Sequence, residues 1–316
     1  GMSGYQESLT DPSFCGQIVV MTYPLVGNYG TNDLFNQGRK SFFQGYVISE
    51  LCDHPSNWRC EKTLEQFLDE QDVPVLTGVD TRAITRKLRN YGVLQGVIVP
   101  AEMPQEEVEK LLATPEVHDQ VATVTTPEIY TLGNGKYHVA VMDFGIKQNI
   151  LEYLASFDCH LTVFPAYTIA EEILAARPDG IFLANGPGDP KDLQPIIEEV
   201  KKLIGKKPIF GICLGHQILA LANGADTFKM KFGHRGVNHP VKDLETGRVY
   251  ISSQNHGYVV DAEGLEEKNI AHPAFVNVND GTNEGMAYNG KNIFTVQFHP
   301  EACPGPQAVS YTHLTL

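Results

Sequence analysis

Between residues 137 and 224, short apolar runs typical of buried strands alternate regularly with segments whose apolar residues have helical spacing. Short apolar runs of strand length lie at 137–142, 160–164, 180–184 and 208–211. Each run is followed by residues with helical spacing, at 148–156, 169–176, 195–204 and 217–222. Four strand–helix units in succession predict a parallel sheet whose two faces are covered by helices.

The pattern changes on both sides of this region. After residue 226, short runs between turns predict strands at 248–252, 258–260, 274–276, 285–288 and 292–298. Before residue 133 the order of elements is mixed, with helices predicted at 63–72, 81–90 and 105–112 and a strand at 93–99. We therefore expect a smaller α+β domain over 1–133 and a doubly wound, mostly parallel α/β domain over 137–316. Pro127, Gly133 and Gly135 indicate a linker over 123–135.

Charge and composition narrow the class of protein. The chain has 316 residues, 42% of them hydrophobic, and a formal net charge of −14, so we expect neither a nucleic acid nor an anionic membrane as partner. It has no apolar run long enough to span a bilayer, and its first residues lack the pattern of a secretory signal. Six scattered cysteines suggest neither a disulfide framework nor a zinc site. We expect a cytoplasmic protein.

The segment with the clearest chemistry is Gly211-Ile212-Cys213-Leu214-Gly215, between a predicted strand and a predicted helix. A sharp strand-to-helix turn lifts its central residue clear of the sheet, as in a nucleophile elbow. The flanking glycines suit a strained turn with close helix–strand packing, and the helix N-terminus favours a thiolate. The alternative is a buried structural cysteine, which is the commonest fate of a free cysteine.

His299 and Glu301 are candidates to work with this thiol. A cysteine nucleophile needs a base, and the base needs an acceptor that orients it. Residues two apart in an extended segment point the same way, so the Glu301 carboxylate can reach the side of the His299 imidazole. In isolation this pair would be a surface histidine beside a glutamate; its position after the last strand of the same domain favours a catalytic role.

A glycine-rich turn at 185–190, NGPGDP, directly follows another strand of the predicted sheet and leaves the same sheet edge as Cys213. Its backbone N–H groups can serve as oxyanion donors or bind a carboxylate, although such a sequence alone is more often just a turn. His216 inside the elbow helix is expected to be structural. No nucleotide-binding fingerprint occurs, and we expect no metal site in this chain.

With these residues established, the chain resembles the glutamine-hydrolysing small-subunit family of carbamoyl-phosphate synthase. Residues 137–301 resemble triad-class (class I) glutamine amidotransferases through NGPGDP at 185–190, GICLGHQ at 211–217 and HPE at 299–301. The small-subunit family in particular is indicated by DFGIK at 143–147, KFGH at 231–234, NHP at 238–240 and QNHGY at 254–258. Residues 4–7, 10–13, 30–33 and 78–82 resemble its N-terminal domain.

The resemblance implies a flavodoxin-like amidotransferase domain in which Cys213 attacks the carboxamide of L-glutamine and His299, oriented by Glu301, moves the proton. Gly186 and Leu214 would hold the oxyanion. The residues implied in glutamine binding are Ser13, Gly186, Gly188, Leu214, Gln217, Asn255, Gly257 and Tyr258. Ammonia from a γ-glutamyl thioester would pass to a large synthetase subunit that binds ATP and magnesium and makes carbamoyl phosphate for arginine and pyrimidine synthesis. No cofactor is expected in this chain.

Two departures from the family pattern are evident. The family's N-terminal domain begins some tens of residues before the match at Met2, and the tail 308–316 does not resemble the expected terminal helix. Two other functions stay open: a catalytically impaired scaffold that regulates a synthetase, and an amidotransferase or γ-glutamyl hydrolase serving another enzyme. Cys213 argues against the scaffold, and the N-terminal block argues against the second.

Overall fold

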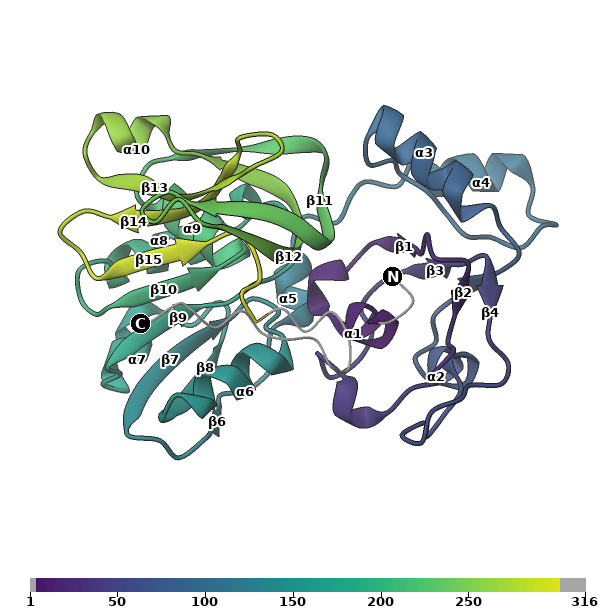
Figure 1. The fold of residues 1–316 in the computed structure, drawn as a ribbon, viewed down its shortest axis with the longest axis horizontal. Coiled ribbons are helices and arrows are strands. Elements are labelled where there is room, and N and C mark those ends of the chain that lie inside the picture. Colours follow the sequence, from purple (N-terminus) through teal and green to yellow (C-terminus); the bar gives the residue numbers. More distant parts are fainter. Residues whose placement is uncertain (1–3, 302–316) are drawn as a thin grey trace. The chain divides into compact units, whose positions relative to one another are not determined.

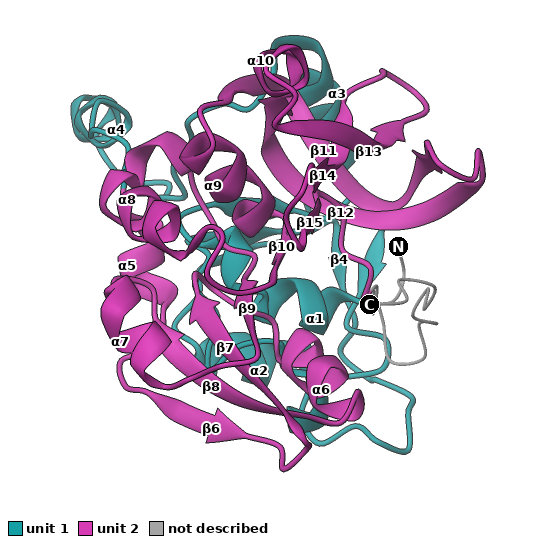
Figure 2. Ribbon diagram, turned by 90° about the vertical axis from the view of Figure 1, so that its left-hand side faces the viewer, with its two compact units in different colours: residues 1–118, 304–307 teal, residues 119–303, 308–316 magenta. Residues whose placement is uncertain are grey.

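The computed structural model describes residues 4–301, which excludes the tail at 308–316 (Figure 1). The chain divides into two compact units, whose described residues are 4–118 and 119–301 (Figure 2). Within 4–301, none of the helices has the length and hydrophobicity that crossing a bilayer requires.

The first unit is built from short elements. Its helices are α1 (Tyr5–Thr10), α2 (Leu64–Glu70), α3 (Thr81–Tyr91) and α4 (Gln105–Leu112), with 3-10 turns η1 (Pro12–Phe14) and η2 (Asp33–Phe35). Its parallel sheets are β1-β3-β5 (Ile18–Val20, Gly45–Val47, Val75–Leu76) and β2-β4 (Leu25–Val26, Glu50–Leu51). The core comprises side chains of α1, α2 and β3, with Tyr5, Tyr46 and Leu64 fully buried. This is the small α+β unit that the sequence predicts.

The three predicted helices of this unit are confirmed, and the predicted strand at 93–99 is wrong. The Asp80 carboxylate caps α3 by accepting the Ala83 N–H at 2.9 Å, and Gly92 ends the helix with a φ of 93°. Residues 93–99 form no strand; Val93 is 57% and Leu94 53% exposed. β-branched residues favour a strand only where a partner strand and a core face are available.

Glu7 is a buried acid in this first unit, and neither of its carboxylate oxygens has a regular hydrogen-bond partner among the residues that the structure describes. Burial raises the pKa of Glu7 to about 7, and its own backbone N–H opposes only part of that rise. The unfolded chain therefore loses this proton near pH 4.5 while the folded chain keeps it to about pH 7. The free energy of unfolding should fall between those two values, by up to about 3 kcal/mol, and then level off.

We expect Glu7→Gln to remove this pH dependence and to make the unit more stable than the wild type at pH 8. Urea unfolding followed by near-UV circular dichroism at pH 5 and pH 8 would measure it. Glu65→Gln, on the exposed face of α2, is the matched control and should keep the wild-type dependence. Identical pH profiles for Glu7→Gln and the wild type would contradict the assignment.

The second unit is organised around a ten-stranded sheet in the order β12-β11-β13-β14-β15-β10-β9-β7-β8-β6. The five strands from β15 to β8 run parallel: β15 (Ile293–Val296), β10 (Ile209–Ile212), β9 (Gly180–Leu183), β7 (Tyr137–Asp143) and β8 (Cys159–Pro165). The others pair antiparallel: β6 (Tyr130–Leu132), β11 (Asp226–Asp243), β12 (Val249–Asp261), β13 (Ala271–Asn277) and β14 (Asn283–Tyr288). The parallel centre confirms the predicted fold class.

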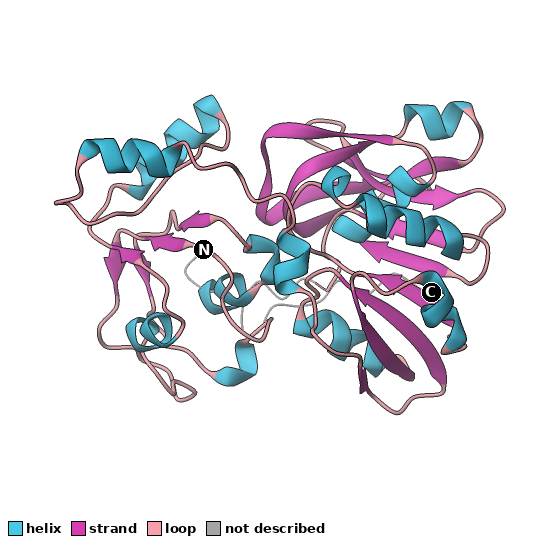
Figure 3. Ribbon diagram, turned by 180° about the vertical axis from the view of Figure 1, so that it is seen from behind, coloured by secondary structure: helices cyan, strands magenta, loops and turns pink. Residues whose placement is uncertain are grey.

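Helices cover both faces of the parallel strands. Figure 2 shows α7 (Ala170–Ala175), α8 (Gln194–Leu203) and α9 (Leu214–Ala222) on one side and α6 (Gln148–Ser156) on the other. The remaining elements are α5 (Gln120–Val124), η3 (Pro190–Asp192) and α10 (Glu263–Glu267), and Figure 3 separates helices, strands and loops by colour. The core contains the apolar side chains of β7, β8, β9 and β10. Doubly wound packing places the loops after the parallel strands at one sheet edge.

The segment at 123–135 is not a free linker. The unit boundary lies between His118 and Asp119, before the position at 133 that the sequence indicates. Within this segment Tyr130–Leu132 pairs antiparallel with β8, and Thr125 Oγ1 donates to the Asp143 carbonyl at 2.6 Å. Proline and glycine mark turns here, but the three residues between those turns complete the edge of the large sheet.

Candidate active site

Cys213 occupies the turn between β10 and α9. Its backbone has φ 54° and ψ −105°, a strained conformation for a residue other than glycine. The Cys213 N–H donates to the Val296 carbonyl of β15 at 2.9 Å, which anchors the turn to the neighbouring strand. Functional sites are where such strain is usually retained. The elbow predicted from the sequence is therefore present in its geometry.

Gly215 allows α9 to approach β9. A Cβ atom at this position would lie 2.2 Å from the Leu183 carbonyl oxygen, and the Gly215 N–H donates to the Ala184 carbonyl at 2.9 Å. Neither backbone group can move without shifting the strand. Close helix–strand packing is thus the reason for glycine here.

We expect Gly215→Ala to lower the free energy of unfolding by about 1–3 kcal/mol, because overpacking against backbone displaces the helix. Gly264→Ala in α10 is the matched control, since a Cβ there meets nothing within 4 Å. Chemical denaturation of both variants provides the measurement. Equal stabilities would show that the elbow tolerates a side chain at 215.

His299 and Glu301 follow β15 and lie together beside this turn. Their side chains are joined by a 2.7 Å hydrogen bond between Nδ1 of His299 and Oε1 of Glu301, and both residues are buried. The His299 N–H donates to the Ser253 carbonyl of β12 at 2.9 Å. With Nδ1 protonated toward the carboxylate, Nε2 is left for the thiol.

The electrostatics of this group couple the imidazole to the thiol. Burial and the Lys147 charge lower the pKa of His299, but the Glu301 charge and the hydrogen bonds that the imidazolium donates to Cys213 and Glu301 outweigh them and raise it to about 9. Nε2 has no hydrogen bond of regular geometry among the described residues, so its contact with the thiol is a loose one. Catalytic hydrogen bonds commonly tighten only when substrate is bound.

Lys147 is the residue of this site that analysis of the sequence missed as a functional group. Its Nζ lies 2.5 Å from Oε1 of Glu301, with side-chain exposures of 10% and 2%. Burial raises the pKa of Glu301, but the charges of Lys147 and His299 hold it well below its usual value. The available signal was topological: Lys147 follows β7, so it lies at the same sheet edge as Cys213.

The glycine-rich loop borders the elbow as predicted. A Cβ on Gly186 would lie 2.8 Å from a side-chain carbon of Leu214 and 2.2 Å from the Phe144 carbonyl oxygen, so only glycine fits. Leu214 begins α9, where the first N–H groups have no partner within the helix. The Gly188 backbone, with φ 91°, lies farther along the loop near the Gln120 side chain.

Strand β12 carries three further predicted residues, Asn255, Gly257 and Tyr258, and Gln217 of α9 contacts this strand. The Asn255 carbonyl accepts from the Cys213 thiol at 3.8 Å, and Nδ2 of Asn255 is buried without a partner in the described part of the chain. Gln217 donates through Nε2 to the Tyr258 carbonyl and to Oε1 of Gln297, both at 2.9 Å, so its amide holds β12 against α9. Gly257 lies between Asn255 and Tyr258 on this strand.

Ser13 and His216 are the two remaining residues that the sequence singles out. Ser13 belongs to the first unit, where its N–H donates to the Asp11 carboxylate at 2.8 Å, and its role in glutamine binding stays a prediction. His216 is fully buried in α9, with Nδ1 2.8 Å from Oγ1 of Thr295. Burial lowers the pKa of His216 to about 3, so it is neutral and packs in the interior.

Comparison with known proteins gives matches over nearly the whole chain. Residues 1–98 match the family model "Carbamoyl-phosphate synthase small chain, CPSase domain", and residues 140–316 match "Glutamine amidotransferase class-I". The carbamoyl phosphate synthase small chain of Clostridium acetobutylicum is 50% identical over 98% of this chain and 88% of its own length. Those of Clostridium perfringens and Bacillus cereus are each 51% identical, over 98% and 97% of this chain and 88% and 84% of their own lengths.

Proposed function

The chain belongs to the carbamoyl phosphate synthase small chain family, and on that premise we propose that it hydrolyses L-glutamine at Cys213 and delivers the ammonia to a large synthetase subunit. Membership makes this chain a glutamine amidotransferase, the glutaminase subunit of a carbamoyl phosphate synthase. The observation that supports the residue assignment is the convergence of a strained Cys213 with His299 and Glu301 at one sheet edge.

In the proposed first half-reaction, the Cys213 sulfur attacks the carbonyl carbon of the glutamine side chain as a thiolate paired with the His299 imidazolium. The Gly186 and Leu214 N–H groups would donate to the oxygen that gains negative charge. His299 then gives its Nε2 proton to the departing nitrogen, the C–N bond breaks, and ammonia leaves. A γ-glutamyl thioester remains on Cys213.

In the second half-reaction, neutral His299 takes a proton from water as the water oxygen attacks the thioester carbon. The C–S bond breaks, the thiolate and imidazolium are restored, and the γ-carboxylic acid product loses its proton to solvent as glutamate. Glu301 holds Nδ1–H throughout, which fixes the ring's tautomer and stabilises its charged form. The Lys147 charge balances that of the buried Glu301 carboxylate. The site therefore holds two ion pairs, Lys147 with Glu301 and the Cys213 thiolate with the His299 imidazolium.

The substrate is proposed to lie along β12. Asn255, Gly257 and Tyr258 would contact glutamine together with Gly188 and Ser13, while Gln217 holds the strand in place. We propose that ATP and magnesium bind to the large subunit, and that neither nucleic acid nor membrane is a partner. A cytoplasmic location suits the chemistry, because a reducing compartment keeps the Cys213 thiol free.

Reconstitution with a large synthetase subunit tests this proposal. The two chains together should co-purify, release glutamate from glutamine, and form carbamoyl phosphate from glutamine, bicarbonate and ATP. A complex that forms carbamoyl phosphate from ammonia but not from glutamine would identify the chain as a scaffold. If the chain releases glutamate but does not co-purify with the large subunit, it would instead be an amidotransferase that supplies ammonia to another synthase.

A further inference from the structure

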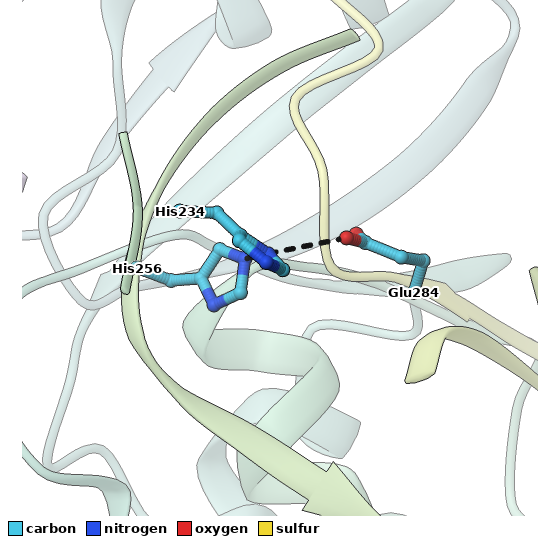
Figure 4. Close-up of side chains that lie close together, drawn as sticks. All are labelled: His234, His256 and Glu284. Carbon is cyan, nitrogen blue, oxygen red and sulfur yellow. Dashed lines mark hydrogen bonds and ion pairs between the residues drawn. The ribbon is translucent and has the colours of Figure 1, made fainter. Parts of the chain in front are cut away.

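A second buried cluster of polar side chains lies next to the active site and takes no part in the triad. His234 of β11, His256 of β12 and Glu284 of β14 point toward one another (Figure 4). All three are buried; their exposures are 5%, 6% and 0%. A carboxylate with no solvent contact is costly to bury unless a cation is nearby, so this cluster needs an explanation of its own.

The backbone is shaped to bring these side chains together. His234 and His256 are directly opposite each other in the β11–β12 ladder, and register shifts interrupt that ladder on both sides of His234. Bulges of this kind re-aim side chains and are common beside functional sites. Asn255 directly precedes His256 on β12, and successive side chains of a strand point to opposite faces, so neighbouring positions of one strand can serve the proposed glutamine site and this cluster.

Two of the three separations within the cluster are those of ligands around one ion. Nδ1 of His234 lies 3.2 Å from Nε2 of His256 and 3.4 Å from Oε1 of Glu284. Tetrahedral ligands held about 2.0–2.1 Å from a metal are about 3.3–3.4 Å from one another. One oxygen or nitrogen from each side chain lies within 4.8 Å of the others.

The outer contacts hold both rings in the orientation that ligation requires. Nε2 of His234 is 2.7 Å from the Asp280 carboxylate, so it carries a hydrogen and leaves Nδ1 bare in the neutral ring. Nδ1 of His256 is 2.8 Å from the Tyr258 carbonyl, which leaves Nε2 bare in the same way. A carboxylate or carbonyl behind each ligating imidazole is the usual outer shell of a metal site.

With both imidazole rings neutral, Nε2 of His256 and Oε2 of Glu284 have no hydrogen-bond donor among residues 4–301. Oε1 of Gln254 lies 2.7 Å from the bare Nε2 of His256, so two acceptors face each other. Turning the amide over would instead point its oxygen at Oε1 of Glu284, which now accepts from Nε2 of Gln254 and from Nδ2 of Asn277, both at 2.9 Å. Oε2 of Glu284 is buried and has no hydrogen-bond partner within residues 4–301. A cation between these atoms would satisfy them together.

We propose that His234, His256 and Glu284 bind one divalent transition-metal ion of the zinc type. Two imidazole nitrogens and one carboxylate are a donor set that zinc prefers, whereas magnesium and calcium favour oxygen ligands. The ion would fix β12 behind Asn255 and thereby position that strand against Cys213. The sequence gives no sign of this site, because its ligands come from three strands at positions 234, 256 and 284.

Zinc binding to the full-length chain tests the proposal. After treatment with a chelator and reloading with zinc chloride, the protein should retain about one equivalent by elemental analysis and show a higher melting temperature. His234→Ala should abolish both effects. Asp280→Asn, which removes only the outer carboxylate, should weaken zinc binding by about 10–100-fold. His272→Asn, an exposed histidine of β13, is the matched control and should bind as the wild type does.

Cys213→Ser separates this site from the triad, whose thiol and imidazole could also bind zinc. The proposed site should keep its equivalent in that variant, and X-ray absorption of the loaded Cys213→Ser protein should show nitrogen and oxygen ligands with two imidazole rings. That measurement does not depend on whether His234→Ala folds. No retained zinc in either protein, or zinc lost with Cys213→Ser and kept with His234→Ala, would overturn the proposal.

Discussion

Replacing Cys213 with alanine should lower glutamine-dependent activity of the complex with its large subunit by about 10⁴-fold or more, the scale seen when a covalent nucleophile is removed. Synthesis of carbamoyl phosphate from added ammonia should continue, because that route does not need the thioester. The reason lies in the position of the sulfur, at a strained turn beside His299 and against the Asn255 carbonyl. Steady-state rates of glutamate release and of carbamoyl phosphate formation measure both routes.

Cys159→Ala provides the matched control, because Cys159 is another buried free cysteine of the same unit, located on β8. It should keep wild-type glutaminase activity. Wild-type Cys213 should also carry a glutamyl adduct when the enzyme is quenched during turnover and analysed by mass spectrometry. Glutamate release that survives in Cys213→Ala would rule out the covalent route through this thiol.

The parallel half of the second unit could be predicted from the sequence because its signals are local. Strands β7, β8, β9 and β10 are short apolar runs, and each is followed by a segment of clear helical period. The elbow was predictable for the same reason: two glycines, a cysteine and a helix lie within one short stretch. His299 and Glu301 were predictable as a pair because their spacing alone determines that they face the same side.

What the sequence could not indicate depends on contacts between distant segments. Lys147 follows β7, which β9 and β10 separate from β15, so its ion pair with Glu301 depends on the strand order and not on spacing along the chain. The His234 cluster needs the register of β11 with β12 and the approach of β14. The predictions of a strand at 93–99 and of a linker at 123–135 are wrong because strand formation depends on a partner strand elsewhere in the fold. Residues 93–99 have no such partner, whereas residues 130–132 pair with β8.

Lys147→Met and Glu301→Gln should shift the pH profile of glutamine hydrolysis in opposite directions. The alkaline limb of kcat/KM reports loss of the His299 imidazolium proton that the leaving nitrogen needs. The Lys147 charge lowers the pKa of His299 and the Glu301 charge raises it. Removing the lysine therefore moves the alkaline limb to higher pH, and removing the carboxylate charge moves it to lower pH. His299, Glu301 and Lys147 titrate as a coupled group, so the quantity to compare between the two variants is the direction in which the alkaline limb shifts.

Lys147→Met should also destabilise the protein by about 3–5 kcal/mol, since it leaves the Glu301 carboxylate buried with His299 as its remaining charged neighbour. Lys191→Met is the matched control: its ion pair with Asp226 is about half exposed, and its loss should cost at most about 1 kcal/mol and leave the pH profile unchanged. Urea unfolding and pH–rate profiles measure the two effects separately. Parallel shifts of the alkaline limb in Lys147→Met and Glu301→Gln would mean that His299 is not controlled by the charges of this buried pair, even if both variants lose stability.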